Sequence, residues 1–168
     1  GVPEIATPSN LTLCDELGSV TEGVDFIQEN APEQLDVKQK LFRELDKTAP
    51  TSVIISSSTS GLIMSEMQEN IENAERFVVG HPFNPPHLIP LVEVVGGELT
   101  AAEVVEWTID FYNLIGKHAI KINKEVPGHL ANRLQAALWR EAVLAVQNGL
   151  ASVEDVCLLY TSDAADDD

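Results

Sequence analysis

The sequence has few cysteines, and it has no long apolar run. Its two cysteines, Cys14 and Cys157, lie far apart and form neither a metal-binding nor a redox spacing. We therefore expect reduced thiols in a cytoplasmic compartment. No stretch of roughly 18 or more apolar residues occurs, and no basic segment followed by an apolar one opens the chain. Both absences predict a soluble, unsecreted protein without a membrane partner.

Basic residues are also scarce, with 10 Lys and Arg against 27 Asp and Glu. The formal net charge of −17 repels the phosphates of nucleic acids and of anionic membranes, so we expect no non-specific binding to either. A ligand that carries phosphate would have to be held locally, by backbone donors and a few lysines. With 168 residues the chain can form one domain of ordinary size with its own core.

Apolar periodicity predicts a mixed α/β fold. We expect a strand at residues 24–27, an amphipathic helix over 33–47 and a buried strand at 53–55, which together make a βαβ unit. The other expected elements, in chain order, are a short strand at 11–13, helical residues near 16–22, a helix over 62–73, a helix over 104–115 opened by a capping box at 100–103, a strand at 119–122 and a long helix over 129–147.

Two apolar runs, residues 77–79 and 91–95, flank a proline-rich connection and predict a pair of strands. The connection over 84–90 is too short for a parallel crossover, so we expect the strands to be antiparallel neighbours. His81 ends the first run and Glu93 lies inside the second. A carboxylate in an apolar strand needs a partner, because an unpaired buried charge is costly. If Glu93 accepts a hydrogen bond from one imidazole nitrogen, the other nitrogen can accept a proton, as in an acid–base pair.

Other interpretations of these residues stay open. A His–Glu pair on adjacent strands is often a structural hydrogen bond, so the spacing alone allows a structural or a catalytic role. His81, His87 and Glu93 contain metal-ligating groups, but the prolines and apolar residues between them match no closed metal site, so we expect no metal. The hydroxyl-rich loop 56–61 after a buried strand fits a helix N-cap as well as a ligand loop.

The stretch around His81 resembles the catalytic segment of the L-3-hydroxyacyl-CoA dehydrogenase family. That family's pattern, His-x-Phe-Asn-Pro followed by Leu-Val-Glu-Val, is matched by residues 81–85 and 91–94. The two prolines at 85–86 and the run over 89–93 are closer to the branch that holds L-gulonate dehydrogenase (lambda-crystallin) and carnitine dehydrogenase. The resemblance runs from about residue 11 to about residue 156. It implies the C-terminal part of a Rossmann-like NAD-binding domain with antiparallel strands at one edge, followed by the first helix of an all-α domain.

The resemblance also implies roles for individual residues. The family's catalytic set corresponds to His81, Glu93, Ser60 and Asn132, and its cofactor contacts correspond to Glu33, Lys38, Ser60 and Asn84. The implied reaction is the NAD-dependent oxidation of the 3-hydroxyl of a 3-hydroxyacyl-CoA or of a small 3-hydroxy acid. Such an oxidation requires a base for the hydroxyl proton, which an imidazole can supply, and a hydride acceptor, which NAD supplies.

The sequence departs from the family pattern at two places. Residues 57–60 read Ser-Ser-Thr-Ser where many members have Ser-Asn-Thr-Ser, so an amide near the cofactor is replaced. No glycine-rich dinucleotide fingerprint occurs in the sequence. We therefore expect the chain to begin partway through the Rossmann domain, and we expect the isolated chain to be inactive.

These observations predict three segments and leave two functional classes open. We expect a partial NAD-binding domain over 1–127 that lacks its first βαβ unit, the start of a helical domain over 128–156, and a non-native, disordered acidic tail over 157–168. The resemblance implies a homodimer for the full-length protein. The first class is a dehydrogenase acting on an acyl-CoA, carnitine or gulonate, and the second is a non-catalytic structural or binding relative of the lambda-crystallin type. The joint presence of the family's site residues favours the dehydrogenase.

Overall fold

The structure is a computed structural model that describes residues 10–161. The chain divides into two compact units, Gly1–Pro127 and Gly128–Asp168. The first unit is built around a β-sheet, and the described part of the second consists of helices. None of the helices in the described part of the chain is long and apolar enough to span a membrane.

The strands described in the first unit form a single five-stranded sheet in the order β1-β2-β3-β4-β5. The strands are β1 (Phe26–Glu29), β2 (Ile54–Ser57), β3 (Phe77–Pro82), β4 (Leu91–Gly96) and β5 (His118–Lys121). The first three are parallel, β4 runs antiparallel to β3, and β5 runs parallel to β4. The prediction of an α/β sheet with antiparallel strands at one edge is confirmed.

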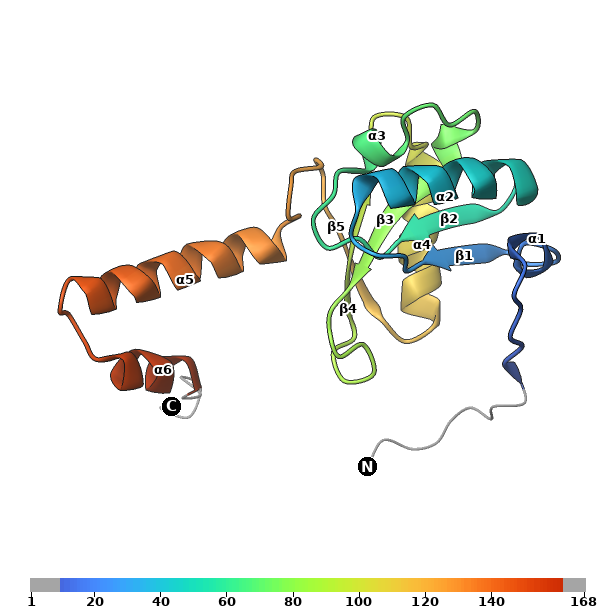
Figure 1. The fold of residues 1–168 in the computed structure, drawn as a ribbon. Helices are drawn as coiled ribbons and strands as arrows, with labels where there is room; N and C mark the ends of the chain where they lie inside the picture. The colour runs from blue at the N-terminus through green and yellow to red at the C-terminus, as the bar shows by residue number, and fades with distance from the viewer. Residues whose placement is uncertain (1–9, 162–168) are drawn as a thin grey trace. The chain divides into compact units, whose positions relative to one another are not determined.

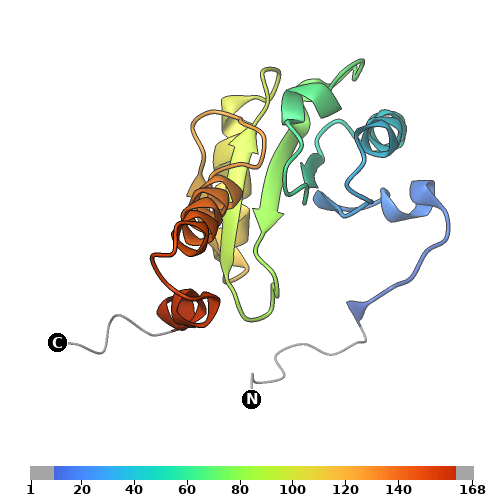
Figure 2. The same ribbon diagram turned by 60° about the vertical axis from the view of Figure 1, so that its left-hand side comes forward.

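Helices cover both faces of the sheet. The helices α2 (Leu35–Thr48) and α3 (Met64–Met67) lie on one face, and α4 (Ala102–Leu114) lies on the other, as the two views show (Figure 1, Figure 2). The first unit also includes the short helix α1 (Leu17–Val20) and the 3-10 turn η2 (Ala74–Arg76). Since the sheet is covered on both faces, successive residues of β2, β3 and β4 are buried rather than alternately buried and exposed.

Each face of the sheet has its own buried cluster. The cluster on the α2 face contains Phe42, Leu45, Ile55, Met64, Met67, Phe77, Val79 and Val95. The cluster on the α4 face contains Ile54, Val78, Val92, Val94, Val104, Val105 and Tyr112. Consecutive residues of a strand point to opposite faces, which is why Val78 and Val79 belong to different clusters.

Three predicted elements of the first unit are wrong. Residues 11–13, although described, do not form a strand. The helix expected over 62–73 is reduced to α3, because Asn70 adopts a left-handed φ of 61° and the chain turns away before η2. Within the described chain, α4 begins at Ala102 without the predicted capping box. The hydroxyl of Thr100 instead donates to the carbonyl oxygen of Phe77 at 2.6 Å and accepts from the N–H of Gly97 at 2.8 Å.

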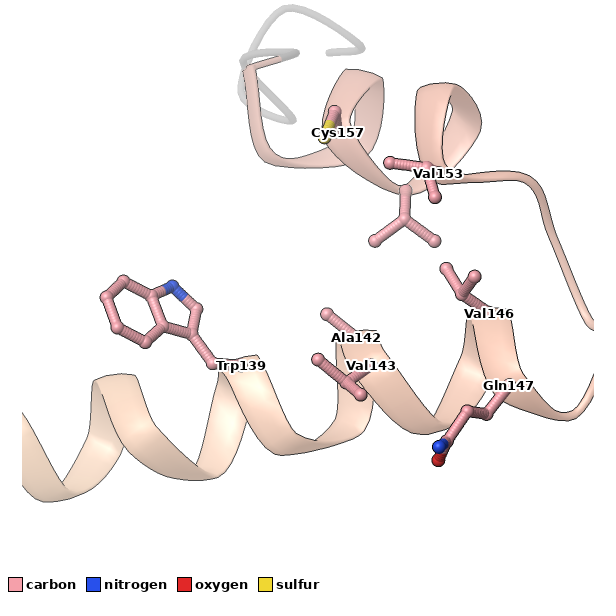
Figure 3. A pocket seen from close by; sticks show the side chains of 8 residues that line it. Trp139, Ala142, Val143, Val146, Gln147, Val153 and Cys157 are labelled. Carbon is pink, nitrogen blue, oxygen red and sulfur yellow. The ribbon is translucent and has the colours of Figure 1, made fainter.

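The described part of the second unit consists of α5 (Ala131–Gln147) and α6 (Val153–Thr161). Along α5, which is described in full, no side chain is buried. The two helices line an open, almost entirely apolar groove (Figure 3), whose walls are formed by Trp139, Ala142, Val143, Val146, Gln147, Val153, Val156 and Cys157. The predicted disordered tail is wrong for residues 157–161, which belong to α6, and the rest of that tail lies outside the described residues.

Candidate active site

The three parallel strands end at one edge of the sheet, and predicted site residues lie at or just beyond that edge. Glu29 ends β1, Ser57 ends β2, and His81 lies next to the end of β3. Glu29 is in register with Ser57, and Ser57 is in register with Val79, so the strands end side by side. In open α/β sheets, ligands bind outside the carboxyl ends of the parallel strands. The fold therefore presents this edge as the candidate site.

His81 and Glu93 face each other across the antiparallel pair β3 and β4. Nδ1 of His81 lies 3.0 Å from Oε2 of Glu93. The Glu93 side chain is 1% exposed and the His81 side chain 12% exposed. An ionised carboxylate can only accept hydrogen bonds, so Nδ1 carries the hydrogen and donates it. This tautomer makes Nε2 the nitrogen of the neutral ring that can accept a proton, although the catalytic role itself stays a prediction.

Lys38 is fully buried, and its ammonium is held by Glu29. Nζ of Lys38 lies 2.8 and 2.9 Å from the two carboxylate oxygens of Glu29 and 3.0 Å from the carbonyl oxygen of Ala31. The hydroxyl of Ser57 donates to Oε2 of Glu29 at 2.6 Å. Buried charges are tolerated when they are paired and hydrogen-bonded. The ion pair therefore joins the ends of β1 and β2 to α2.

Glu33 holds the loop that carries Ser60. Its Oε1 accepts from the hydroxyl of Thr59 at 2.6 Å and from the N–H groups of Ser60 and Gly61, each at 3.0 Å. Burial alone would raise the pKa of Glu33. The hydrogen bonds from the loop and the charge of Lys38, whose Nζ lies 3.8 Å from Oε2 of Glu33, outweigh burial and hold the pKa of Glu33 below its ordinary value of 4.5.

The hydroxyl-rich loop 56–61 was also consistent with a helix N-cap. In the structure it does not cap the N-terminus of α3. The hydroxyl of Thr59 accepts from the N–H of Leu62 at 3.0 Å, in the turn that precedes α3. The helix itself begins one turn later, and Ile63, its described N-cap residue, provides no side-chain cap. Glu33, which lies just before the N-terminus of α2, thus fixes the loop. Ser60 is exposed at this edge of the sheet.

The remaining predicted site residues lie on two different parts of the chain. Asn84 is exposed just beyond β3, and its peptide bond to Pro85 is cis. Asn132 is exposed on α5 in the second unit. Among Glu33, Lys38 and Ser60, Glu33 joins the other two, through a hydrogen bond from the N–H of Ser60 and an ion pair with Lys38. Among the described residues, no three His, Cys, Asp or Glu side chains are placed to hold a metal ion.

Two residues of this edge were not predicted from the sequence, namely Glu29 and Ser57. The argument that Glu93 needs a partner applies equally to Glu29, a carboxylate at the end of an apolar strand. Lys38, nine residues further on, was singled out for the cofactor and not as that partner. The position of Lys38 in the first turn of the helix that follows β1 was the pattern that could have identified the ion pair.

Residues 5–126 match the model of the family described as "3-hydroxyacyl-CoA dehydrogenase, NAD binding domain". The chain belongs to this family. The match contains both the His81–Glu93 pair and the cluster around Glu33, so these groups lie within the family's NAD-binding domain. NAD is the cofactor of that domain, as the sequence resemblance implied.

The chain is similar to L-carnitine dehydrogenases of several bacteria. The enzyme from Streptomyces coelicolor is 52% identical over 161 residues, which make up 96% of this chain and 51% of that enzyme. The enzyme from Pseudomonas aeruginosa is 50% identical over 156 residues, 93% of this chain and 49% of that enzyme. The chain thus spans about half the length of the curated relatives it matches.

Solved structures of other dehydrogenases have a similar fold. The 3-hydroxybutyryl-CoA dehydrogenase of Escherichia coli K12 matches with a TM-score of 0.77 and 32% identity, over 82% of this chain and 29% of that one. An NAD⁺-dependent 5-formyl-3-hydroxy-2-methylpyridine 4-carboxylic acid 5-dehydrogenase matches with a TM-score of 0.80 and 38% identity, over 85% and 46%. The predicted Rossmann-like architecture is therefore confirmed.

Proposed function

We propose that this chain supplies the acid–base pair and part of the cofactor site of an NAD-dependent dehydrogenase. The reaction is the oxidation of the 3-hydroxyl of a small 3-hydroxy acid, with L-carnitine as the first candidate substrate. The observation that supports it most is the 3.0 Å hydrogen bond between His81 and Glu93, at the ligand-binding edge of the sheet in a chain of this family.

The oxidation of a secondary alcohol gives both His81 and Glu93 a role. The hydroxyl proton must leave as the carbon is oxidised, and Nε2 of His81 is the atom that takes it. The imidazolium that forms is stabilised by the buried carboxylate of Glu93 through the Nδ1–H bond. Bound NAD supplies the hydride acceptor. Ser60 orients the substrate oxygen, because a fixed geometry removes much of the entropic part of the barrier.

The cluster around Glu33 suits a cofactor that carries hydroxyl groups. The side chain of Glu33 is 41% exposed, so its carboxylate is accessible to a hydroxyl donor while it holds the loop. Ser60 and Asn84 add exposed hydroxyl and amide groups at the same edge. Lys38 lies against Glu29 with its side chain 1% exposed. We assign it an indirect part, in which its charge favours the ionised form of Glu33.

Two features favour a small free acid over a CoA thioester. The relatives that are 52% and 50% identical are named L-carnitine dehydrogenases. CoA would also add further phosphates to those of NAD, which a net charge of −17 disfavours, whereas that charge attracts the quaternary ammonium group of carnitine. A 3-hydroxyacyl-CoA is the second candidate, supported by the likeness to 3-hydroxybutyryl-CoA dehydrogenase.

A chimeric enzyme tests the proposal. The matched 161-residue segment of the Streptomyces coelicolor L-carnitine dehydrogenase is replaced by the corresponding residues of this chain. NADH formation is then followed with L-carnitine, L-gulonate and 3-hydroxybutyryl-CoA. We expect L-carnitine oxidation within about tenfold of the parent enzyme, since the catalytic groups are retained.

The controls separate the alternatives. The same chimera carrying His81→Gln should be folded and nearly inactive. Oxidation of the thioester alone would contradict the small-acid substrate. A chimera that is folded and binds NADH but oxidises none of the three substrates would favour the non-catalytic alternative.

A further inference from the structure

A second polar cluster lies on the face of the sheet opposite to His81. Tyr112 of α4 is 5% exposed, and its hydroxyl donates to Oε1 of Gln28 on β1. The same hydroxyl lies 3.1 Å from Oγ of Ser56, a fully buried residue of β2. Nε2 of Gln28 donates in turn to the carbonyl oxygen of Gly80 on β3, at 3.3 Å. Groups from three strands and one helix thus meet beside the apolar cluster of the α4 face.

The hydrogen bonds of this cluster run in one direction. A phenol has one hydrogen to donate, and Gln28 receives it, so the hydroxyl of Ser56 is the donor to Tyr112. The order is therefore Ser56 to Tyr112, Tyr112 to Gln28, and Gln28 to Gly80. Burial raises the pKa of Tyr112 to about 12, so the phenol keeps its hydrogen at the pH values at which enzymes act.

Gly80 is the point where this cluster reaches β3. A Cβ atom at position 80 would lie 2.2 Å from the hydroxyl of Tyr112 and 2.4 Å from Oγ of Ser56. The phenol thus occupies the space that a side chain at position 80 would need, and glycine allows this close approach. The carbonyl of Gly80 and the backbone nitrogen of His81 belong to one planar peptide unit.

We propose that Tyr112 is a positioning residue for His81. Through Gln28 it fixes the peptide plane that precedes His81, and so keeps the imidazole on the α2 face within hydrogen-bonding distance of Glu93. Residues 80 and 81 point to opposite faces of β3, so a rotation of their shared peptide plane displaces the ring directly. The inference rests on the proposed function of His81 and adds to it a group from the far side of the sheet.

The first test does not require turnover. The 168-residue chain contains four histidines, so histidine-labelled protein gives a simple nitrogen NMR spectrum in which the Nδ1–H of His81 can be assigned with His81→Gln. We expect Tyr112→Phe to speed the exchange of that hydrogen with water by about tenfold, because its bond to Glu93 opens more often. Val104→Ala is the matched control, since Val104 is buried in the same helix and cluster. It should leave the exchange nearly unchanged.

The second test uses the chimeric enzyme. We expect Tyr112→Phe to lower kcat by about tenfold and to leave KM within about twofold, because a displaced base affects the chemical step and not ground-state binding. Gln28→Leu removes the amide that donates to Gly80 and leaves only the 3.5 Å contact of the phenol with that carbonyl, so it should change kcat in the same direction. Val104→Ala should lower thermal stability and leave kcat near that of the parent chimera.

The outcomes distinguish a failure of the positioning role of Tyr112 from a failure of the proposed function. Equal effects of Tyr112→Phe and Val104→Ala on exchange and on kcat would reduce Tyr112 to a packing residue and overturn the proposal. Unchanged exchange in both Tyr112→Phe and Gln28→Leu would overturn it as well. An inactive parent chimera would contradict the proposed function, whereas faster exchange in Tyr112→Phe would still support the positioning of His81.

Discussion

Two carboxylates of the sheet are buried to nearly the same degree, yet their partners differ in kind. Glu29 is 3% exposed and is bonded to Lys38, which is itself buried, and to the hydroxyl of Ser57. Glu93 is fully buried and is bonded to His81, whose side chain keeps 12% of its surface exposed. A lysine ammonium only donates, whereas an imidazole changes between donor and acceptor as it titrates.

Burial of a carboxylate therefore does not by itself indicate catalysis, because the partner of the carboxylate differs between the two pairs. The pair of Glu29 and Lys38 is closed to solvent on both sides, so it holds strand ends and a helix together. In the pair of Glu93 and His81, one partner, His81, is partly exposed to solvent. Removing a partner from the first pair should therefore reduce stability, and removing one from the second should reduce turnover.

The largest expected effect is a loss of stability when the buried pair of Glu29 and Lys38 is broken. Lys38→Met should lower the free energy of unfolding by about 3–5 kcal/mol, because it leaves Glu29 buried without its cation. Urea denaturation of the 168-residue chain measures this change. Lys40→Met, at an exposed position of the same helix, is the control. A loss below about 1 kcal/mol would show that Glu29 and Lys38 behave as a surface pair, and the comparison would fail.

Breaking the pair of His81 and Glu93 should instead reduce turnover more than stability. His81→Gln in the chimeric enzyme should lower kcat by roughly a hundredfold or more, because the base is gone. The glutamine amide can still donate to Glu93, so the melting temperature and KM should change much less. His118→Gln, at an exposed position of β5, controls for the loss of an imidazole. Turnover close to that of the parent chimera would rule out His81 as the base.

A third carboxylate, Glu33, differs from Glu29 and Glu93 because it is partly exposed. Its pKa in the folded chain lies below the ordinary value of 4.5, so its ionised form stabilises the fold. That contribution is complete above the ordinary value and is lost as the pH falls through the lowered pKa of the folded chain. Glu33→Gln should therefore cost less than about 1 kcal/mol at neutral pH, and the difference from the wild type should shrink in acid.

Calorimetry over a series of pH values measures this small difference. Glu44→Gln, at an exposed position of α2, is the control. A difference in melting temperature between wild type and Glu33→Gln that grows toward acid would contradict the lowered pKa of Glu33.

The parts of the structure that were predictable from the sequence depend on short stretches of chain. The apolar runs of β3 and β4, and the short connection between them, were enough to predict an antiparallel pair with His81 opposite Glu93. Those two residues are only twelve positions apart. The assignment of Ser60 and Glu33 came from the resemblance. Nothing in the spacing of these two residues predicts that the carboxylate of Glu33 holds the loop that carries Ser60.

What was not predicted depends on contacts between distant residues. The hydroxyl of Thr100 fits a capping box locally, but it bonds to the carbonyl of Phe77, which lies 23 positions earlier. Gln68 was expected inside a long helix, yet its amide donates to Ala74 and Thr100, where the chain turns. In each case a tertiary hydrogen bond competes with the local preference and prevails.

The register of β3 against β4 has a consequence for how the sequence can vary. Side chains alternate between the faces of a strand, so a deletion of one residue inside β4 would turn Glu93 away from His81 toward the α4 face. A deletion or insertion in the connection over 83–90 leaves the alternation of both strands intact. The pairing of His81 with Glu93 is therefore encoded in the phase of the two strands and not in the length of the loop between them.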